Sequence, residues 1–351
     1  MKKNRWMALG LSALMILGLA ACGSTSSGSA AGGSETGSTE ESTAAAAETA
    51  DSEGAAGAQK YTIGICQLVQ HPALNAATKG FRDAIDEALP GQVSFDEQNA
   101  AGDSATCITI AGTLVSEKVD LILANATPAL QAVTSATAEI PILGTSVTEY
   151  GTALSIENFD GTVGGNVSGT SDLAPLDQQA AIFDELLPDA ENIGILYCSA
   201  EANSVYQASV VEKALTEKGK KVTVYTFADS NDVATVTQNA CNDNDALYIP
   251  TDNTAASCTE AIDNVARSSK TPIVCGEESI MAGCGIATLS IDYYELGKTT
   301  GQMAVRILTG EQQISEMPVE YYQNPVKKYD ADRCAEYGIE VPEDYTAYEA
   351  E

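Results

Sequence analysis

His71 is the only histidine among the 351 residues of this chain, and it follows an apolar run in "GICQLVQHPALNAATKGF" (residues 64–81). The sequence offers no nucleophile elbow G-x-S-x-G, no H-E-x-x-H zinc motif and no P-loop. The stretch "GGNVSG" at 164 also lacks the G-x-G-x-x-G spacing of a dinucleotide site. One histidine without a nucleophile or a cofactor motif predicts that the chain is not an enzyme and holds no metal or cofactor.

His71 suits the corner between a strand and a helix better than proton transfer. Pro72 follows it, and proline fits the first position of a helix because its missing N–H would have no helical partner there. In a chain with 49 acidic and 18 basic residues, adjacent carboxylates such as Glu277 and Glu278 usually lie on the solvated surface. Glu277, however, directly follows an apolar run, where its charge could meet an ammonium group.

The elements that would position these residues occur twice in the chain. Four strand-like runs recur in the same order with an offset of roughly 130 residues, which indicates an internal duplication. Helical stretches separate the runs, a pattern that predicts parallel strands with crossover helices in each half. The pairs are "YTIGICQL" at 61 with "NIGILYCS" at 192, "QVSFDEQ" at 92 with "KVTVYTFA" at 221, "DLILANATPAL" at 120 with "ALYIPTDNTAA" at 246, and "IPILGTS" at 140 with "TPIVCGEES" at 271.

Two such sheets facing each other would form a cleft for a ligand. Ligands of open parallel sheets bind beyond the carboxyl ends of the strands, where helix N-termini offer unpaired N–H groups. The polar residues that follow the runs are therefore candidates for the site, although each could instead be the N-cap of a helix. They are Gln67, His71, Asn125, Thr127, Thr145 and Ser146 in the first half, and Ser199 to Ser204, Thr251 to Asn253 and Glu277 in the second.

The first 59 residues have the composition of an export signal followed by a tether. Residues 1–21 combine a basic start with a short apolar stretch, and "LAAC" ending at Cys22 resembles a bacterial lipobox. We expect cleavage before Cys22 and lipidation of its sulfur; a transmembrane anchor is the alternative reading. Residues 22–59 are almost all Gly, Ser, Ala, Thr and Glu, and we expect a disordered tether that holds the protein at the extracytoplasmic face of the cell membrane.

The net charge of the chain disfavours some classes of partner, and the positions of its cysteines indicate whether they form disulfides. The formal net charge of −31 disfavours nucleic acid and an anionic membrane surface, so the only membrane contact we expect is the N-terminal lipid. Eight cysteines remain beside Cys22, and several lie in apolar runs where a thiol behaves as a small hydrophobe. We expect mostly free thiols, with Cys275–Cys284 and Cys241–Cys258 as the candidate bridges.

The end of the chain is expected to cross between the two halves. The segment "DYYELGKTTGQMAVRILTGE" at 292 predicts an amphipathic helix returned to the first half, and "ADRCAEYGIEVP" predicts a helix of the second. Several crossings make a hinge that can open and close. We expect residues 60–171 and 288–313 to form an N-terminal lobe, and residues 172–287 and 314–345 to form a C-terminal lobe.

Five segments together resemble the substrate-binding proteins of ABC importers, in particular those for tryptophan and tyrosine uptake. The segments are "QxxxHPALNAATKGF", "GNVSGTSD", "EANS", "PTDNT" and "IDYYELGKTTGQMAVRIL", and the resemblance covers roughly residues 60–345. It implies an α/β type I periplasmic-binding-protein fold, with two Rossmann-like lobes joined by a hinge of several crossings. It also implies a monomeric lipoprotein that captures an aromatic amino acid by lobe closure and delivers it to ABC permease subunits.

Transferred by position, the resemblance implies a ligand site shared by both lobes. Tyr206 could line a slot for an aromatic side chain, or could pack on its own lobe. A receptor of the same fold that serves a membrane kinase or chemoreceptor remains an alternative, and an α/β enzyme using the cleft is a third. The expected ligand contacts are Gln67, His71, Asn125, Thr127 and Ser146 on the first lobe, and Asp172, Asn203, Ser204, Tyr206, Asp252, Asn253 and Glu277 on the second lobe or near the hinge.

Overall fold

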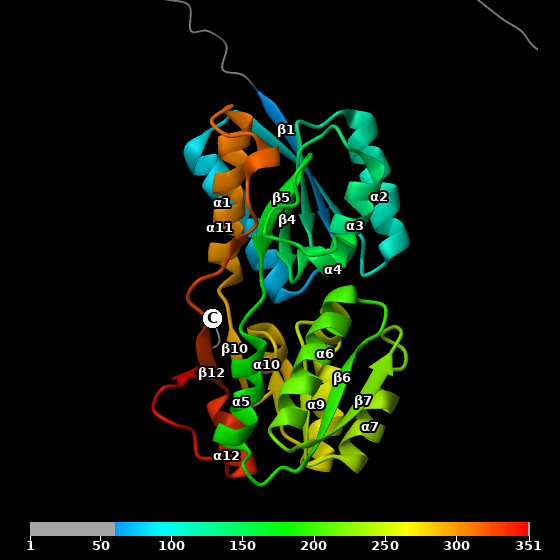
Figure 1. The fold of residues 1–351 in the computed structure, drawn as a ribbon, viewed down its shortest axis with the longest axis vertical. Helices are drawn as coiled ribbons and strands as arrows, with labels where there is room; N and C mark the ends of the chain where they lie inside the picture. Colours follow the sequence, from blue (N-terminus) through cyan, green and yellow to red (C-terminus); the bar gives the residue numbers. More distant parts are fainter. Residues whose placement is uncertain (1–59, 350–351) are drawn as a thin grey trace, which may run out of the picture. The chain divides into compact units, whose positions relative to one another are not determined.

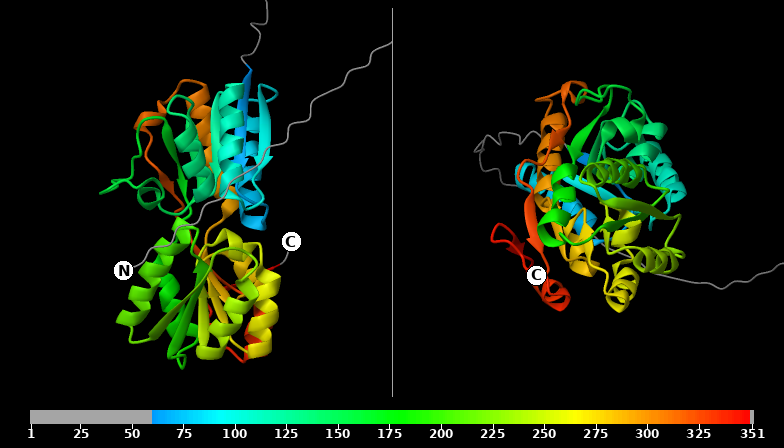
Figure 2. Two further views of the ribbon diagram at one scale, coloured as in Figure 1. Left: turned by 90° about the vertical axis from the view of Figure 1, so that its right-hand side faces the viewer. Right: turned by 60° about the horizontal axis from the view of Figure 1, so that its bottom comes forward.

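The computed structural model describes residues 60–349, which contain two sheets in two lobes (Figure 1, Figure 2). The expected signal peptide (1–21), the lipidated Cys22 and the tether (22–59) lie outside the described residues. Within the described part of the chain, no helix combines the length and apolarity needed to cross a membrane.

The first sheet has six strands in the order β11-β5-β4-β3-β1-β2, all parallel. Helices α1 and α11 cover one face and α2 and α3 the other (Figure 1). The strands are β1 (Tyr61–Gln67), β2 (Val93–Asn99), β3 (Leu121–Asn125), β4 (Ile142–Val147), β5 (Val167–Ser171) and β11 (Glu320–Tyr321). The helices are α1 (Pro72–Ala88), α2 (Ser104–Glu117), α3 (Thr127–Ala136), α4 (Tyr150–Leu154) and α11 (Tyr293–Leu308).

Alternation along the buried strands builds a core on each face of this sheet. Leu121 and Leu123 of β3 pack with Phe81 of α1 and Met303 of α11, whereas Ile122 between them faces the cluster under α2 and α3. Successive side chains of a strand point to opposite faces, so a strand covered on both sides is apolar throughout. This explains why the strand-like runs lack a polar alternation.

The second sheet has seven strands in the order β13-β12-β10-β9-β8-β6-β7. Five of its strands are parallel, and β12 and β13, which are parallel to each other, run antiparallel to them. The strands are β6 (Asn192–Cys198), β7 (Lys221–Phe227), β8 (Ala246–Ile249), β9 (Ile273–Cys275), β10 (Ala287–Ser290), β12 (Val326–Tyr329) and β13 (Thr346–Ala347). The helices are α5 (Leu176–Leu186), α6 (Ala202–Glu217), α7 (Val233–Asp243), α8 (Asn253–Ala256), α9 (Thr259–Ser269), α10 (Glu278–Cys284) and α12 (Ala331–Tyr337).

The predicted duplication is visible in the strand order. The sequence β2-β1-β3-β4 in the first sheet recurs as β7-β6-β8-β9 in the second. The four repeated runs therefore occupy equivalent places, and the predicted α/β fold with two parallel-sheet lobes is confirmed. Strand β12 is the exception: the chain adds it beside β10 when it returns from the first lobe, and β13 then pairs with it at the edge of the sheet.

Three stretches of chain connect the two sheets, and two nearby segments differ from our expectation. Strand β10 pairs with β9 and stays in the second sheet, although we placed residues from 288 onward in the first lobe. Strand β11 pairs with β5, and Met317 is buried in the first-lobe core, although we placed residues from 314 onward in the second lobe. Burial of Ile314 and Met317 in the first-lobe core holds the segment 314–321 on the first sheet before the chain crosses back to the second.

All eight cysteines of the described residues are free thiols. The expectation of mostly free thiols is confirmed, and neither candidate bridge, Cys275–Cys284 or Cys241–Cys258, is formed. Seven of the eight are buried and Cys258 is partly exposed, so they fill the cores as small apolar groups.

Candidate ligand-binding site

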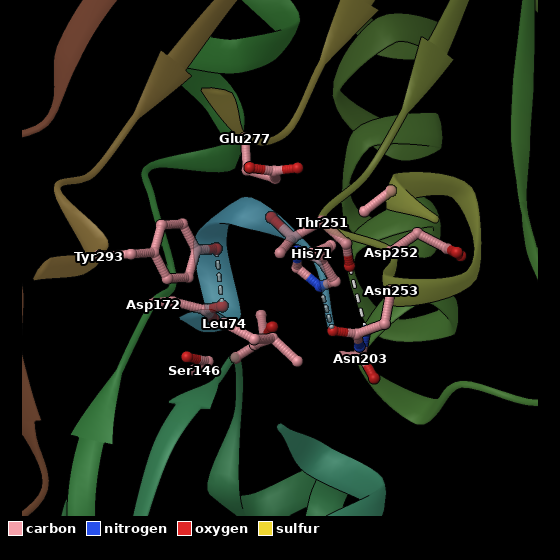
Figure 3. A pocket seen from close by; sticks show the side chains of 12 residues that line it. His71, Leu74, Ser146, Asp172, Asn203, Thr251, Asp252, Asn253, Glu277 and Tyr293 are labelled. Atoms are coloured by element: carbon pink, nitrogen blue, oxygen red, sulfur yellow. Dashed lines mark hydrogen bonds between the residues drawn. The ribbon is translucent and has the colours of Figure 1, made fainter. Parts of the chain in front are cut away.

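A narrow pocket lies where the carboxyl ends of the two sheets face each other (Figure 3). Its cavity volume is only about 10 Å³. The walls therefore lie close together. The lining residues are His71, Leu74, Ser146, Thr148, Asp172, Asn203, Thr251, Asp252, Asn253, Ala256, Glu277 and Tyr293.

The first-lobe wall presents a helix N-terminus and a strained strand end. His71 is the N-cap of α1, but its side chain makes no capping hydrogen bond, so the N–H groups of the first turn have no side-chain acceptor. Ser146 adopts a positive φ of 54° at a register shift between β4 and β5. Such backbone strain in a non-glycine residue is commonly found at functional sites.

Asp172 and Tyr293 come from two of the segments that connect the lobes. Asp172 follows β5, and its Oδ2 accepts a 3.0 Å hydrogen bond from the hydroxyl of Tyr293, the first residue of α11. Burial raises the pKa of Asp172 to about 6, and the nearby Glu277 adds to the rise, while the hydroxyls of Thr148 and Tyr293 oppose it. The carboxylate is thus desolvated, and a cation in the pocket would stabilise its charged form.

The acidic residues of the second-lobe wall are occupied by their own lobe. Asp252 is the N-cap of α8, and its two oxygens accept 2.7 Å bonds from the N–H groups of Ala255 and Cys198. Burial raises its pKa to about 7, with a further contribution from Glu201. Glu277 caps α10 and accepts from Ser279 and Ile280. Both carboxylates line the pocket, but each mainly stabilises a helix start.

A hydrogen bond between the lobes closes one side of the pocket. The Nε2 of His71 lies 3.2 Å from the Oδ1 of Asn253 in the second lobe. Asn253 is held in turn by Glu201, whose Oε2 accepts from the Asn253 side chain at 2.6 Å and from its backbone N–H at 3.1 Å. The Oε1 of Glu201 accepts from the N–H and hydroxyl of Thr254. Glu201 therefore fixes the residue that His71 contacts.

Buried polar atoms without a partner gather in this pocket. Among the described residues, eight buried side-chain nitrogen or oxygen atoms have no hydrogen-bond partner, and four of them belong to lining residues. An unpaired buried polar atom costs free energy, so such a concentration indicates a site built for an external polar group. The four atoms are Nδ1 of His71, Oγ of Ser146, Oδ1 of Asp172 and Oδ1 of Asn203.

Seven of the twelve expected ligand contacts lie on the pocket wall. They are His71, Ser146, Asp172, Asn203, Asp252, Asn253 and Glu277.

The other five expected contacts do not line the pocket. Gln67 and Asn125 both bond Thr78 of α1, and this buried network ties α1 to β1 and β3. Ser204 is buried, where it accepts from the Asn203 side chain. The positions that lie away from the pocket wall are Gln67, Asn125, Thr127, Ser204 and Tyr206, the last of which packs on the core of its own lobe.

Five lining residues were absent from our expected contacts. Thr251 follows β8 and was among the strand-end candidates, although it was not in the list of expected contacts; Thr148 follows β4, so the same rule could have found it. Tyr293 starts a helix after a crossing between lobes, which gives no local signal of a pocket. Leu74 and Ala256 are apolar residues of α1 and α8 and look like ordinary core positions.

Two α/β lobes that enclose a polar pocket between the carboxyl ends of their sheets define a solute-binding protein of the periplasmic type. The chain belongs to the family of ABC transporter substrate binding proteins, whose family model matches residues 62–351. Members of this family bind their substrates and do not convert them, so the prediction that the chain is not an enzyme is confirmed.

The chain is similar to proteins with named aromatic ligands. It is 36% identical over 267 residues to a tyrosine-binding protein of Clostridioides difficile (strain R20291), which covers 74% of this chain and 76% of the relative. An ABC domain from Streptococcus pneumonia in complex with L-Trp is 31% identical and superposes with a TM-score of 0.78, covering 81% of this chain and 97% of that one.

The chain is also similar to a protein whose solved structure holds no ligand. The ligand-free, open structure of a substrate binding protein with adhesive properties from Clostridium difficile is 34% identical, covering 83% of this chain and all of that one, yet its TM-score is only 0.64. The TM-score with the L-Trp complex is higher at a similar sequence identity.

Proposed function

We propose that this protein captures an aromatic L-amino acid between its lobes and presents it to the permease of an ABC importer. The observation that carries the proposal is the unpaired Oδ1 of Asp172, a buried carboxylate in the pocket. The ligands named for two relatives, tyrosine and L-Trp, support the aromatic class.

The ammonium group of the ligand binds Asp172. Of the three acidic residues on the wall, Asp172 alone has a side-chain oxygen without a partner, while Asp252 and Glu277 bond the N–H groups of their own lobe. An ammonium donor pairs this oxygen and offsets the desolvation that raises the pKa of the carboxyl.

The carboxylate of the ligand binds the first lobe. The α1 N-terminus carries the partial positive charge of its helix dipole and lacks a side-chain cap, and Leu74 of its first turn lines the pocket. The unpaired hydroxyl of Ser146 supplies a further donor on the same wall. A zwitterion thus spans from Asp172 near the hinge to the start of α1.

The aromatic side chain packs between the rings of Tyr293 and His71 and the apolar groups of Leu74 and Ala256. All four line the pocket. Because the walls lie close together, the ligand enters when the lobes separate and is enclosed when they close. Lipidation at Cys22 keeps the protein at the extracytoplasmic face of the membrane, within reach of the permease.

Calorimetric titration of the purified protein with each of the twenty amino acids tests this proposal. We expect binding of aromatic amino acids only, and Asp172→Asn should weaken it by roughly 10- to 100-fold, because a hydrogen bond to a charged group contributes about 1.5–3 kcal/mol. Asp177→Asn, at an exposed position in the first turn of α5, is the matched control. Binding of another ligand class, or equal affinity in Asp172→Asn, would contradict the proposal.

A further inference from the structure

We infer that His71 selects ligands whose aromatic ring carries an N–H or O–H donor, so that the protein takes tryptophan and tyrosine and rejects phenylalanine. The inference rests on the proposed function and concerns one atom, the Nδ1 of His71, which is buried in the pocket wall without a partner.

The hydrogen bonds of Asn253 fix the proton of the imidazole. Both oxygens of Glu201 accept from backbone N–H groups, so the atom of Asn253 that lies 2.6 Å from Glu201 is the amide nitrogen. The Oδ1 of Asn253 therefore faces His71 and can only accept. The Nε2 of His71 must donate to it, and in the neutral imidazole this leaves Nδ1 as a lone-pair acceptor.

The unpaired acceptors of the pocket wall lie on more than one side of the pocket (Figure 3). The unpaired atoms of its wall include three acceptors, the Oδ1 of Asp172, the Oδ1 of Asn203 and the Nδ1 of His71. The charged oxygen of Asp172 attracts the ammonium more strongly than a neutral imidazole does. Figure 3 shows Asp172 beside Tyr293 on one side of the pocket, and His71 turned toward Asn253 on the other.

A neutral donor on the ligand side chain then pairs the Nδ1 of His71. The indole N–H of tryptophan and the phenol O–H of tyrosine can donate to Nδ1, whereas phenylalanine would leave this buried atom unpaired. Sites built around a buried hydrogen-bonding atom reject analogues that lack the partner far more strongly than sites that read shape alone.

Near-isosteric ligands isolate this donor. In 3-benzothienyl-L-alanine a sulfur replaces the indole N–H of tryptophan, and in 4-fluoro-L-phenylalanine a fluorine replaces the hydroxyl of tyrosine. We expect calorimetry to show at least about ten-fold weaker binding of each analogue than of its parent by the wild-type protein.

Two variants of His71 distinguish the role of its Nδ1 from that of its Nε2. His71→Gln places an amide near the position of Nε2, which keeps the contact with Asn253, and leaves no acceptor at the position of Nδ1. His71→Asn places an amide near the position of Nδ1, but its shorter side chain does not reach Asn253. We expect the preference for tryptophan over its thiophene analogue to fall to about one in His71→Gln and to persist in His71→Asn, even if overall affinity declines. Thermal melts establish that both variants are folded.

The outcomes distinguish this inference from the proposed function. If the wild-type protein binds aromatic amino acids but does not discriminate the analogues, or if His71→Gln keeps the preference, the role of Nδ1 is wrong and the proposed function stands. If both variants unfold, the wild-type comparison of parent and analogue alone decides whether the ligand needs a donor. If no aromatic amino acid binds the wild-type protein, both proposals fail.

Discussion

The hydroxyl of Tyr293 donates a 3.0 Å hydrogen bond to the carboxylate of Asp172, and this bond joins two of the segments that connect the lobes. Asp172 follows β5 where the chain first leaves the first sheet, and Tyr293 begins α11 where the chain comes back to it. The residue that offers a free oxygen to a ligand is thus held by a residue of another connection. A ligand that binds Asp172 therefore contacts a residue of one hinge segment that is hydrogen-bonded to another hinge segment.

Replacing Tyr293 with phenylalanine should weaken both the hinge and the ligand site. Asp172 would lose the donor that helps to hold its pKa down, so the pH below which ligand affinity declines should move upward. We also expect a loss of about 1–3 kcal/mol in the free energy of unfolding. Tyr294→Phe is the control, because the adjacent hydroxyl bonds Asp83 on the first lobe. Titrations across pH 5 to 8 that shift equally in both variants would refute the pairing.

Acidification should strengthen the fold of the ligand-free protein while it weakens ligand binding. Burial raises the pKa of Asp172 to about 6 and that of Asp252 to about 7, so between these values and the unfolded carboxyl pKa near 4 the folded state binds more protons than the unfolded state. Stability from these two groups therefore rises as pH falls from about 7 to 5. Ligand affinity falls over the lower part of this range, because protonated Asp172 cannot pair with an ammonium.

Replacing one carboxylate at a time distinguishes the effect of pH on stability from its effect on ligand affinity. Asp172→Asn should make ligand affinity less dependent on pH, and it should remove the contribution of Asp172 to the pH dependence of the free energy of unfolding. Asp252→Asn should change the pH dependence of the free energy of unfolding and leave that of ligand affinity unchanged. Urea denaturation and calorimetry at pH 5, 6 and 7 measure both. The wild-type minus variant difference also cancels the general repulsion expected from a formal net charge of −31. A pH-independent difference for Asp172→Asn would show that this carboxyl is not perturbed.

The duplication in the sequence predicted the fold because strand runs and their spacing depend on local burial. Positions such as Leu121 to Leu123 are apolar on both faces of the sheet, and that pattern is readable without a structure. The direction of β12 could not be read, since its antiparallel pairing depends on where the chain re-enters the sheet.

The site was harder to predict because neighbouring polar residues face different ways. Gln67 and His71 lie four positions apart on the same strand-to-helix corner, yet Gln67 bonds Asn75 and Thr78 of α1 whereas His71 reaches Asn253 of the other lobe. Tyr293 gave no signal at all, because its place in the pocket arises only from the crossing of the chain. The strand-end rule locates a wall, and tertiary packing decides which side chains face the ligand.

Glu201 should be essential for holding the pocket wall although it does not line the narrow pocket. Its buried carboxylate accepts hydrogen bonds from Asn203, Asn253 and Thr254. Glu201→Gln would place an amide donor against one of these donors. We expect a loss of about 2–4 kcal/mol in the free energy of unfolding and a clear loss of ligand affinity. Glu212→Gln, on the exposed side of α6, should change neither, and equal behaviour of the two variants would rule out this role.

The packing of α11 on α1 requires glycine, which makes it a direct test of how the second connection is anchored to the first lobe. A Cβ at Gly297 would collide with the backbone carbonyl oxygen of Ala77, which cannot move aside without displacing α1. Gly297→Ala should therefore destabilise the protein by about 1–3 kcal/mol or more, because overpacking forces backbone shifts.

Gly112 provides the opposite case within the same lobe. It lies in the exposed face of α2, and a Cβ there would meet nothing within 4 Å. Gly112→Ala should stabilise the protein by up to about 1 kcal/mol, since alanine favours the helix. Urea denaturation of the two variants measures both signs. If Gly297→Ala also stabilised the protein, α1 and α11 would have to lie farther apart than the structure shows, and Tyr293 at the start of α11 could not be held against Asp172 by this helix pair.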